Sequence, residues 1–142
     1  LGQFEALATR YGVTPFVVMT ALSHVIIARF TASDRSVLTF QSSGRKPYPD
    51  SANVIGPFSN SIILVGETPH DKPFAQLVAE QRQGTSTAIR NETYPYHLIV
   101  RETGVQPRFG INWYPSITLL GMNGVEAGPA DDIHRQTNYD LD

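Results

Sequence analysis

The side chains best suited to proton transfer and metal binding are histidines that lie far apart in the sequence. They are His24, His70, His97 and His134, and no HxxxH, HExxH or paired-carboxylate spacing joins them. The chain contains no cysteine, which excludes disulfides, thiolate metal sites and a cysteine nucleophile. No GxSxG, GxGxxG or P-loop sequence is present. The residue types therefore predict no local metal, nucleophile or phosphate motif.

Each histidine has a structural interpretation. His24 lies inside an apolar stretch and is predicted to be a core histidine whose hydrogen bonds are satisfied. His70 and His134 fall in polar segments and are expected to be solvated. His97 follows Tyr-Pro-Tyr at a predicted helix start, where a hydrogen-bonding structural role is favoured over catalysis.

Neutral polar side chains are the better candidates for ligand contact. Residues 59–61, Ser-Asn-Ser, stand at the start of the apolar run 62–65. Polar clusters at strand starts usually satisfy the backbone, so a structural role is favoured here. Ser42 and Ser43 open a Ser-Ser-Gly-Arg stretch, for which a polar turn is favoured over an anion site. Asn112 interrupts an apolar strand and must face a polar cavity or bind backbone; its spacing favours neither.

Hydrophobic periodicity and turn residues predict the elements that position these groups. Thr14 and Asp71 are the predicted caps of two helices, and Pro15 suits the first helical position. The apolar run 62–65 suggests a strand buried on both faces. Helices are predicted at 3–11, 14–31, 71–89 and 96–104, and strands at 36–41, 60–65 and 109–113.

The C-terminal part predicts further strands. Residues 117–120 and 125–127 flank Asn123-Gly124, which suits a tight hairpin turn. Residues 138–142 read as the beginning of another strand. Because helices, strands and hairpins neither alternate strictly nor segregate, the predicted fold class is α/β or α+β with a mixed sheet.

The composition argues against some functional classes. The 142 residues fit one domain, and 41% hydrophobic and 17% charged residues are ordinary for a globular chain. A net charge of −2 without a basic run argues against nucleic acid as the main partner. The apolar stretch 16–30 is too short and polar to span a bilayer, and no signal peptide is recognisable. A cytoplasmic location is expected, and the missing initiator Met suggests a piece of a longer chain.

Four stretches, at residues 36–49, 53–65, 73–100 and 109–115, carry recognisable motifs in a fixed order. Together they resemble the C-terminal half of a nonribosomal peptide synthetase condensation domain. The family has a GR loop, an IGxFVNT motif, an HQDxPFE motif and a PLFxVxFN strand. Here Ser59 and Ser61 replace the Val and Thr of the second motif, and His97 stands where the third usually has Glu. The resemblance covers about residues 12–142, and the four stretches are SVLTFQSSGRKPYP, NVIGPFSNSIILV, PFAQLVAEQRQGTSTAIRNETYPYHLIV and FGINWYP.

The resemblance implies a chloramphenicol-acetyltransferase-like fold, in which a mixed sheet is flanked by helices and two lobes enclose a tunnel. Carrier proteins would deliver acyl and aminoacyl thioesters on phosphopantetheine arms, and a condensation-type acyltransferase of secondary metabolism would join them through an amide bond. The family's catalytic HHxxxDG motif belongs to the N-terminal lobe, and no two histidines are adjacent here. Residues 1–142 are therefore expected to be an incomplete C-terminal lobe, inactive alone and without a directly bound cofactor.

The resemblance also assigns tunnel residues. Asn112 matches the Asn of the family's FN strand, and Ser42 and Ser43 match positions beside the same channel. Asn60 and Ser61 would line the tunnel or hold the backbone where the segment leaves the sheet. Their effect would be positioning rather than acid–base chemistry, and no catalytic residue is expected in this chain. An epimerisation domain, an ester-forming acyltransferase, a non-catalytic carrier-protein platform and an accidental likeness remain as alternatives.

Overall fold

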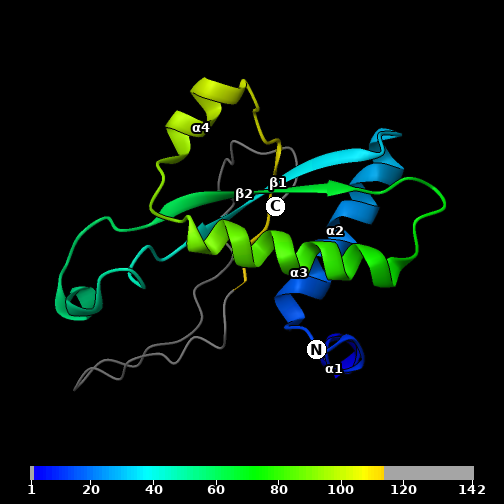
Figure 1. Ribbon diagram of the computed structural model, residues 1–142, viewed down its shortest axis with the longest axis horizontal. Coiled ribbons are helices and arrows are strands. Elements are labelled where there is room, and N and C mark those ends of the chain that lie inside the picture. Colours follow the sequence, from blue (N-terminus) through cyan, green and yellow to red (C-terminus); the bar gives the residue numbers. More distant parts are fainter. Residues whose placement is uncertain (1, 114–142) are drawn as a thin grey trace, which may run out of the picture.

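A computed structural model describes residues 2–113 as helices packed on a small mixed sheet (Figure 1). The α/β class with a mixed, helix-flanked sheet is confirmed. The elements in chain order are α1 (Gly2–Tyr11), α2 (Pro15–Thr31), β1 (Arg35–Ser42), the 3₁₀ helix η1 (Pro49–Asn53), β2 (Asn60–Glu67), α3 (Phe74–Arg90), α4 (Tyr96–Thr103) and β3 (Phe109–Gly110).

The sheet has the strand order β2-β1-β3, so the first strand in the chain is the central one. β1 pairs with β2 in antiparallel fashion from Arg35–Glu67 to Ser42–Asn60. β1 pairs with β3 in parallel, with Thr39 beside Gly110. β3 is shorter than the predicted strand 109–113, although the amide of Ile111 still donates to the carbonyl of Thr39 at 2.8 Å. The predictions for 117–127 and 138–142, and for His134, lie outside the described residues.

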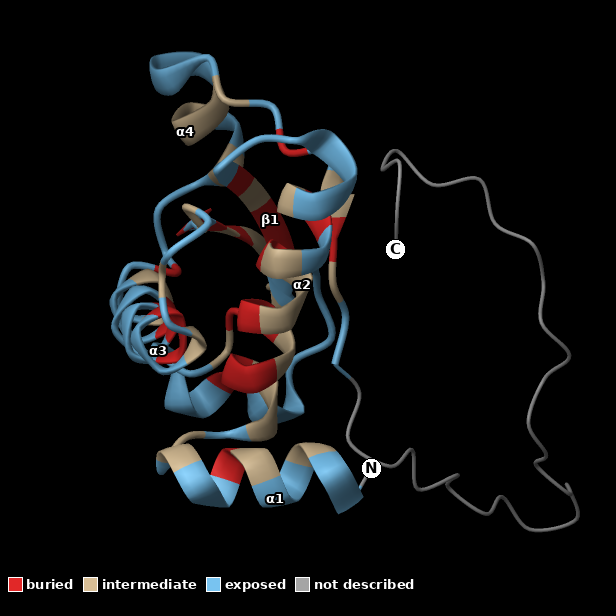
Figure 2. Ribbon diagram, turned by 90° about the vertical axis from the view of Figure 1, so that its right-hand side faces the viewer, coloured by how far each residue is buried: buried red, intermediate tan, exposed pale blue. Residues whose placement is uncertain are grey.

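The two faces of the sheet differ in composition because successive side chains of a strand point in opposite directions. On the first face, Leu38 and Phe40 of β1 and Ile62 and Leu64 of β2 form a buried cluster with Ile27 of α2. Figure 2 shows buried segments, in red, on β1, α2 and α3.

The second face carries the alternate residues of both strands. They are Val37, Thr39 and Gln41 of β1, and opposite them Val65, Ile63 and Ser61 of β2. Val65 remains 44% exposed, so the prediction that the run 62–65 is buried on both faces is wrong. Within residues 2–113, Gln41 is exposed as well, Val37, Ser61 and Ile63 are half-buried, and Thr39 is buried.

α2 is a core helix, as its almost uniformly apolar sequence predicts. Val17 and Ala21 of α2 pack on Leu77 and Val78 of α3 in a second buried cluster. Thr14 occupies the N-cap position and Pro15 opens the helix as predicted, although the Thr14 hydroxyl makes no capping hydrogen bond. Helix–helix packing, rather than a side-chain cap, therefore holds this end of α2.

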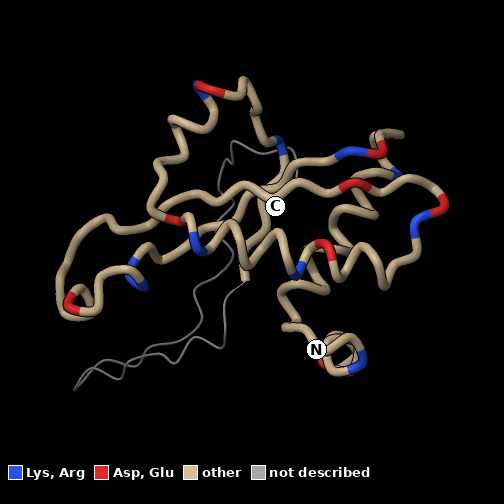
Figure 3. The backbone as a smooth tube through the Cα atoms, viewed as in Figure 1, with Lys and Arg blue, Asp and Glu red and all other residues tan. Residues whose placement is uncertain are grey.

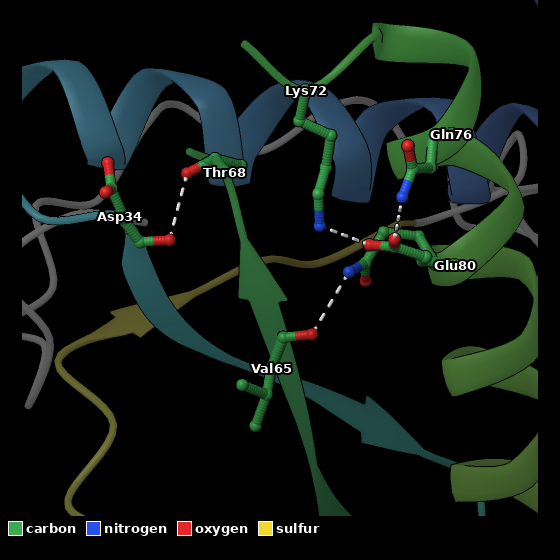
Figure 4. A network of polar contacts seen from close by, with 7 residues as sticks. Asp34, Val65, Thr68, Lys72, Gln76 and Glu80 are labelled. Carbon is green, nitrogen blue, oxygen red and sulfur yellow. Dashed lines mark hydrogen bonds and ion pairs between the residues drawn. The ribbon is translucent and has the colours of Figure 1, made fainter. Parts of the chain in front are cut away.

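The beginning of α3 differs from the prediction. The helix begins at Phe74 with Pro73 at the N-cap position, so Asp71 does not cap it. A polar network fixes the turn instead (Figure 4): the ammonium of Lys72 lies 2.7 Å from Glu80, and Gln76 donates to the other oxygen of Glu80 at 2.9 Å. Because Lys72 binds it, the pKa of the Glu80 carboxyl is held below its usual value.

The connection between β1 and β2 is ordered by Arg45. Its guanidinium donates to the carbonyls of Ser51 and Val54 and stacks 4.4 Å from the ring centre of Phe58. Gly44 has a φ of +64°, and a Cβ there would overlap the carbonyl oxygen of Phe58, so only glycine fits. This rigid loop leaves Ile55 fully exposed at its tip.

No single described helix has the length and apolarity to cross a membrane; only α1 and α2 taken together, with a bend of 98° between them, pass on length and composition. Lys and Arg are interspersed with Asp and Glu along the described chain, without a basic cluster (Figure 3).

Candidate functional site

Four of the five predicted tunnel residues meet at one end of the sheet. Ser42 ends β1 and faces Asn60, which begins β2, while Ser61 faces Gln41. Asn112 comes two residues after Gly110, which lies beside Thr39, and therefore extends toward the same end along the other edge of β1. We call this group, Gln41, Ser42, Asn60, Ser61 and Asn112, the polar end of the sheet.

Ser42 and Asn60 are used to hold the segment between α3 and α4. The Ser42 hydroxyl donates to Oε2 of Glu92, a carboxylate that is only 4% exposed. The Asn60 amide nitrogen donates to the carbonyls of Glu92 and Tyr94, each at 2.8 Å. We call Ser42, Asn60 and Glu92 the clasp.

Asn60 also accepts a hydrogen bond at 3.2 Å from the amide of Tyr96, the first residue of α4. Both polar atoms of its side chain are therefore occupied by backbone groups, which fixes where α4 begins. For Asn60, these contacts match the structural role that the sequence favours for the polar cluster at the strand start, since its side chain satisfies backbone groups. α4 itself has no buried residue, so the clasp contributes much of its attachment to the sheet.

Ser61 has a different environment on the second face. Its Oγ accepts a hydrogen bond at 2.8 Å from Nε2 of Gln41, and the contact is exposed to solvent. A pair of neutral side chains thus stands at the polar end, beside the apolar residues Ile63 and Val65.

Ser43 and Asn112 are exposed and carry no buried contact. Ser43 belongs to the turn before Arg45, whose amide donates to the Ser43 hydroxyl at 3.5 Å. Asn112 and its neighbour Trp113, which is 39% exposed, follow β3.

Glu92 and Gln41 are the residues that sequence reasoning missed. A glutamate between two helices suggests a solvated loop, and nothing in the local pattern indicates that it meets Ser42. Gln41 could have been found, because it precedes Ser42 on the predicted strand and the alternation of a strand places it on the face opposite to the core. The Gln41 assignment depends on the register of β1 and β2, whereas that of Glu92 depends on how the segment between α3 and α4 lies on the sheet.

His24 is part of a buried polar group away from the polar end. Its side chain is fully buried, and Nδ1 lies 2.6 Å from the hydroxyl of Ser36. Nε2 has no hydrogen-bond partner in the described part of the chain, so the prediction of a satisfied core histidine holds for burial and for one nitrogen only.

Burial lowers the pKa of His24 to about 4, since a charged imidazole loses its hydration in the core. The side chain of Gln81 lies near the ring and opposes the shift in part, although it does not reach the geometry of a full hydrogen bond to Nε2. Gly66 provides the room for the ring, because a Cβ there would lie 2.3 Å from the imidazole Cγ.

No group of three or more His, Cys, Asp and Glu side chains within residues 2–113 is arranged to hold a metal ion. His70 and His97 are both exposed. Two surface cavities, of about 460 and 440 Å³, are lined by residues other than the polar end of the sheet.

Comparison with known proteins identifies the class to which this fold belongs. The profile of the family described as "Condensation domain" matches residues 1–112, and the chain belongs to this family. The recognition made from the motif order is therefore confirmed, as is the chloramphenicol-acetyltransferase-like fold.

Individual relatives are larger proteins. Surfactin synthase subunit 1 of Bacillus subtilis (strain 168) is 25% identical over 130 residues, which are 90% of this chain and 4% of that protein. The first condensation domain of the CDA synthetase superposes with a TM-score of 0.73 at 20% identity, covering 85% of this chain and 28% of that one. A four-domain nonribosomal peptide synthetase, holo-AB3403, bound to AMP and glycine, gives a TM-score of 0.73 at 16% identity, covering 78% of this chain and 9% of that one. These structural likenesses are evidence of the fold.

Proposed function

We propose that the protein containing this chain forms amide bonds between carrier-bound acyl or peptidyl thioesters and aminoacyl acceptors. Within it, residues 1–142 would be the C-terminal lobe and supply one wall of the substrate tunnel on the acceptor side. The observation that carries this proposal is the polar end of the sheet: in a chain of the condensation family, neutral hydrogen-bonding residues from β1, β2 and the segment after β3 converge there.

The residues of the wall have distinct tasks in this proposal. Ser61 and Asn112, and Ser43 in the adjacent turn, would contact the reactants. Ser42 and Asn60 would not touch them, because their side chains bind Glu92 and the backbone before α4. The wall would hold the two reactants in place. Because the reactants have then already lost translational and rotational freedom, the activation barrier of the reaction is lower.

The proposal requires partners. Within the 142 residues no two histidines are adjacent, so a companion lobe would have to bring the HHxxxDG motif. Carrier proteins would present the reactants on phosphopantetheine arms, which enter as substrates and do not become part of the chain. An acyltransferase reaction would then belong to the two lobes together.

The test uses the complete parent protein with an acyl group loaded on its donor carrier protein. The acceptor is either an aminoacyl carrier protein or an equivalent hydroxyacyl carrier protein, and mass spectrometry of the released arm reports which bond forms. Amide formation that saturates with the amine acceptor supports the proposal. Ester formation alone would replace it with an ester-forming acyltransferase, and inversion of an acceptor stereocentre without a new bond would indicate an epimerisation domain. Carrier binding without any reaction would leave a non-catalytic platform.

A further inference from the structure

The pair formed by Gln41 and Ser61 has a defined hydrogen-bond direction. The two residues are direct cross-strand partners on the second face of the sheet, and Gln41 Nε2 lies 2.8 Å from Ser61 Oγ. An amide nitrogen can only donate, so the Ser61 oxygen must accept. The Ser61 hydroxyl therefore keeps its own proton, for which residues 2–113 show no acceptor.

The β1 and β2 residues that follow this pair along the second face are uncharged as far as Arg35 and Glu67. Along the second face the next residues are Thr39 and Ile63, followed by Val37 and Val65, and none of these six residues can ionise. The charged residues Arg35 and Glu67 lie opposite each other at the far end of the same two strands. A chain lying along this face would meet the apolar side chains of Val37, Ile63 and Val65, with Thr39 buried between them, and then the Ser61 hydroxyl.

This arrangement fits a specific kind of ligand. A hydroxyl donor at the end of an uncharged band suits a carbonyl oxygen on a neutral, extended chain, whereas a carboxylate or ammonium group would find no charge to pair with and would lose hydration. Thioesters and amides of acyl and peptidyl chains present such an oxygen.

We propose that Gln41 is a positioning residue that turns the Ser61 hydroxyl toward a carbonyl oxygen of a neutral acyl or peptidyl chain. The inference rests on the proposed function and specifies its substrate class at this wall. Gln41 acts through Ser61: it occupies the hydroxyl's acceptor site, so the proton is presented to the ligand. Without Gln41 the hydroxyl rotates freely and is presented only part of the time.

If the Gln41–Ser61 pair has only a structural role, substitution of Gln41 is expected to give a different result. Cross-strand side-chain pairs stabilise sheets by small amounts, and for that role it does not matter which partner donates. If the pair only supports the sheet, a replacement that keeps its size and its hydrogen bond is harmless.

Gln41→Glu provides that replacement in the complete parent protein. A carboxylate has the shape of the amide but can only accept, so Ser61 would donate to residue 41 and lose its proton for the ligand. We expect kcat/KM for condensation to fall about tenfold, as for loss of one hydrogen bond, with the melting temperature unchanged. Gln41→Leu, which frees the hydroxyl without capturing its proton, should lose less than Gln41→Glu.

Two controls separate the reversed hydrogen bond from the added charge. Gln83→Glu places the same change on an exposed position of α3, away from the polar end, and should leave kcat/KM unaltered. In a Ser61→Ala background, Gln41→Glu should have almost no further effect, because the hydroxyl that it captures is already gone.

The outcomes are decisive for this inference and separate from the test of the proposed function. If Gln41→Glu stays within about twofold of the wild-type protein, or costs as much without Ser61 as with it, Gln41 does not position that hydroxyl. If the wild-type protein forms no amide at all, the proposed function fails instead, and Gln41 loses its role with it.

Discussion

Ser42 and Asn60 face each other across the end of the β1–β2 ladder, and both bind Glu92, one through its carboxylate and the other through its main-chain carbonyl. Glu92, which lies between α3 and α4, is thus bound by side chains of two neighbouring strands. These contacts connect the end of the sheet to the start of α4, so the position of α4 depends on the side chains of Ser42, Asn60 and Glu92.

We expect Asn60→Ala to destabilise the protein. The substitution leaves the carbonyls of Glu92 and Tyr94 and the amide of Tyr96 without their partner. Losing these partly buried hydrogen bonds should lower the free energy of unfolding by about 1–3 kcal/mol. Chemical denaturation followed by circular dichroism measures this loss.

Asn53→Ala is the matched control for the clasp, because Asn53 is exposed in η1. Its free energy of unfolding should differ from that of the wild-type protein by no more than about 0.5 kcal/mol. Equal losses for the two variants would show that the clasp contributes nothing specific.

Gly66→Ala should be strongly destabilising although it adds a single methyl group. The new Cβ would lie 2.3 Å from His24, whose ring is enclosed and cannot move aside. Overpacking of this kind costs about 1–3 kcal/mol. Gly84→Ala in α3 is the contrasting substitution: its Cβ meets nothing within 4 Å, so the higher helix propensity of alanine should raise stability by roughly 0.5–1 kcal/mol. Thermal unfolding of both variants should show shifts of opposite sign.

The stability of the protein should depend on pH through His24. Its pKa is about 4 in the folded state and near the ordinary 6.5 when unfolded, so between these values the unfolded chain binds more protons. Stability is therefore fully present above about pH 6.5 and is lost as the pH falls toward 4, by roughly 3 kcal/mol in total. Denaturation at a series of pH values gives this slope.

His24→Gln removes the titrating group and should flatten the slope between pH 4 and 6.5, even if the variant is less stable throughout. His70→Gln should keep the wild-type slope, since His70 is exposed. If His24→Gln retains the full slope, the pH dependence of stability arises from other groups.

Asn112→Ala tests whether Asn112, which follows β3, contacts a reactant. Because Asn112 is exposed, the melting temperature should remain nearly unchanged. If Asn112 orients a reactant, turnover by the parent protein should fall about tenfold, the effect of one lost hydrogen bond. A large stability loss without a specific kinetic effect would instead identify Asn112 as structural.

The sequence is most informative about elements whose boundaries are set locally. Pro15 opens α2, and the period of the apolar residues places α3 and α4 to within a few positions. The sequence fails where a tertiary contact replaces a local signal. Asp71 is a good capping residue, but the turn is held by Lys72 and Glu80, and the helix begins later.

The candidate site could be predicted only in outline. The order of the motifs places Ser42, Asn60 and Ser61 near one another, and their positions at strand ends follow from the predicted strands. Their different tasks could not be predicted, because Ser42 and Asn60 depend on Glu92, which lies in another part of the sequence. The register of β1 and β2, which the sequence leaves open, decides that Ser61 meets Gln41.

The central position of β1 has a consequence for synthesis on the ribosome. β2 follows soon after β1, but Thr39 and Phe109, which meet across the other edge, are 70 positions apart. Until that distant segment has emerged, one edge of the nascent central strand is bare, and a bare edge can pair with another chain. Shortened forms that end before Phe109 should therefore aggregate during expression more than forms that include β3, which pairs with Leu38 and Thr39 of this edge.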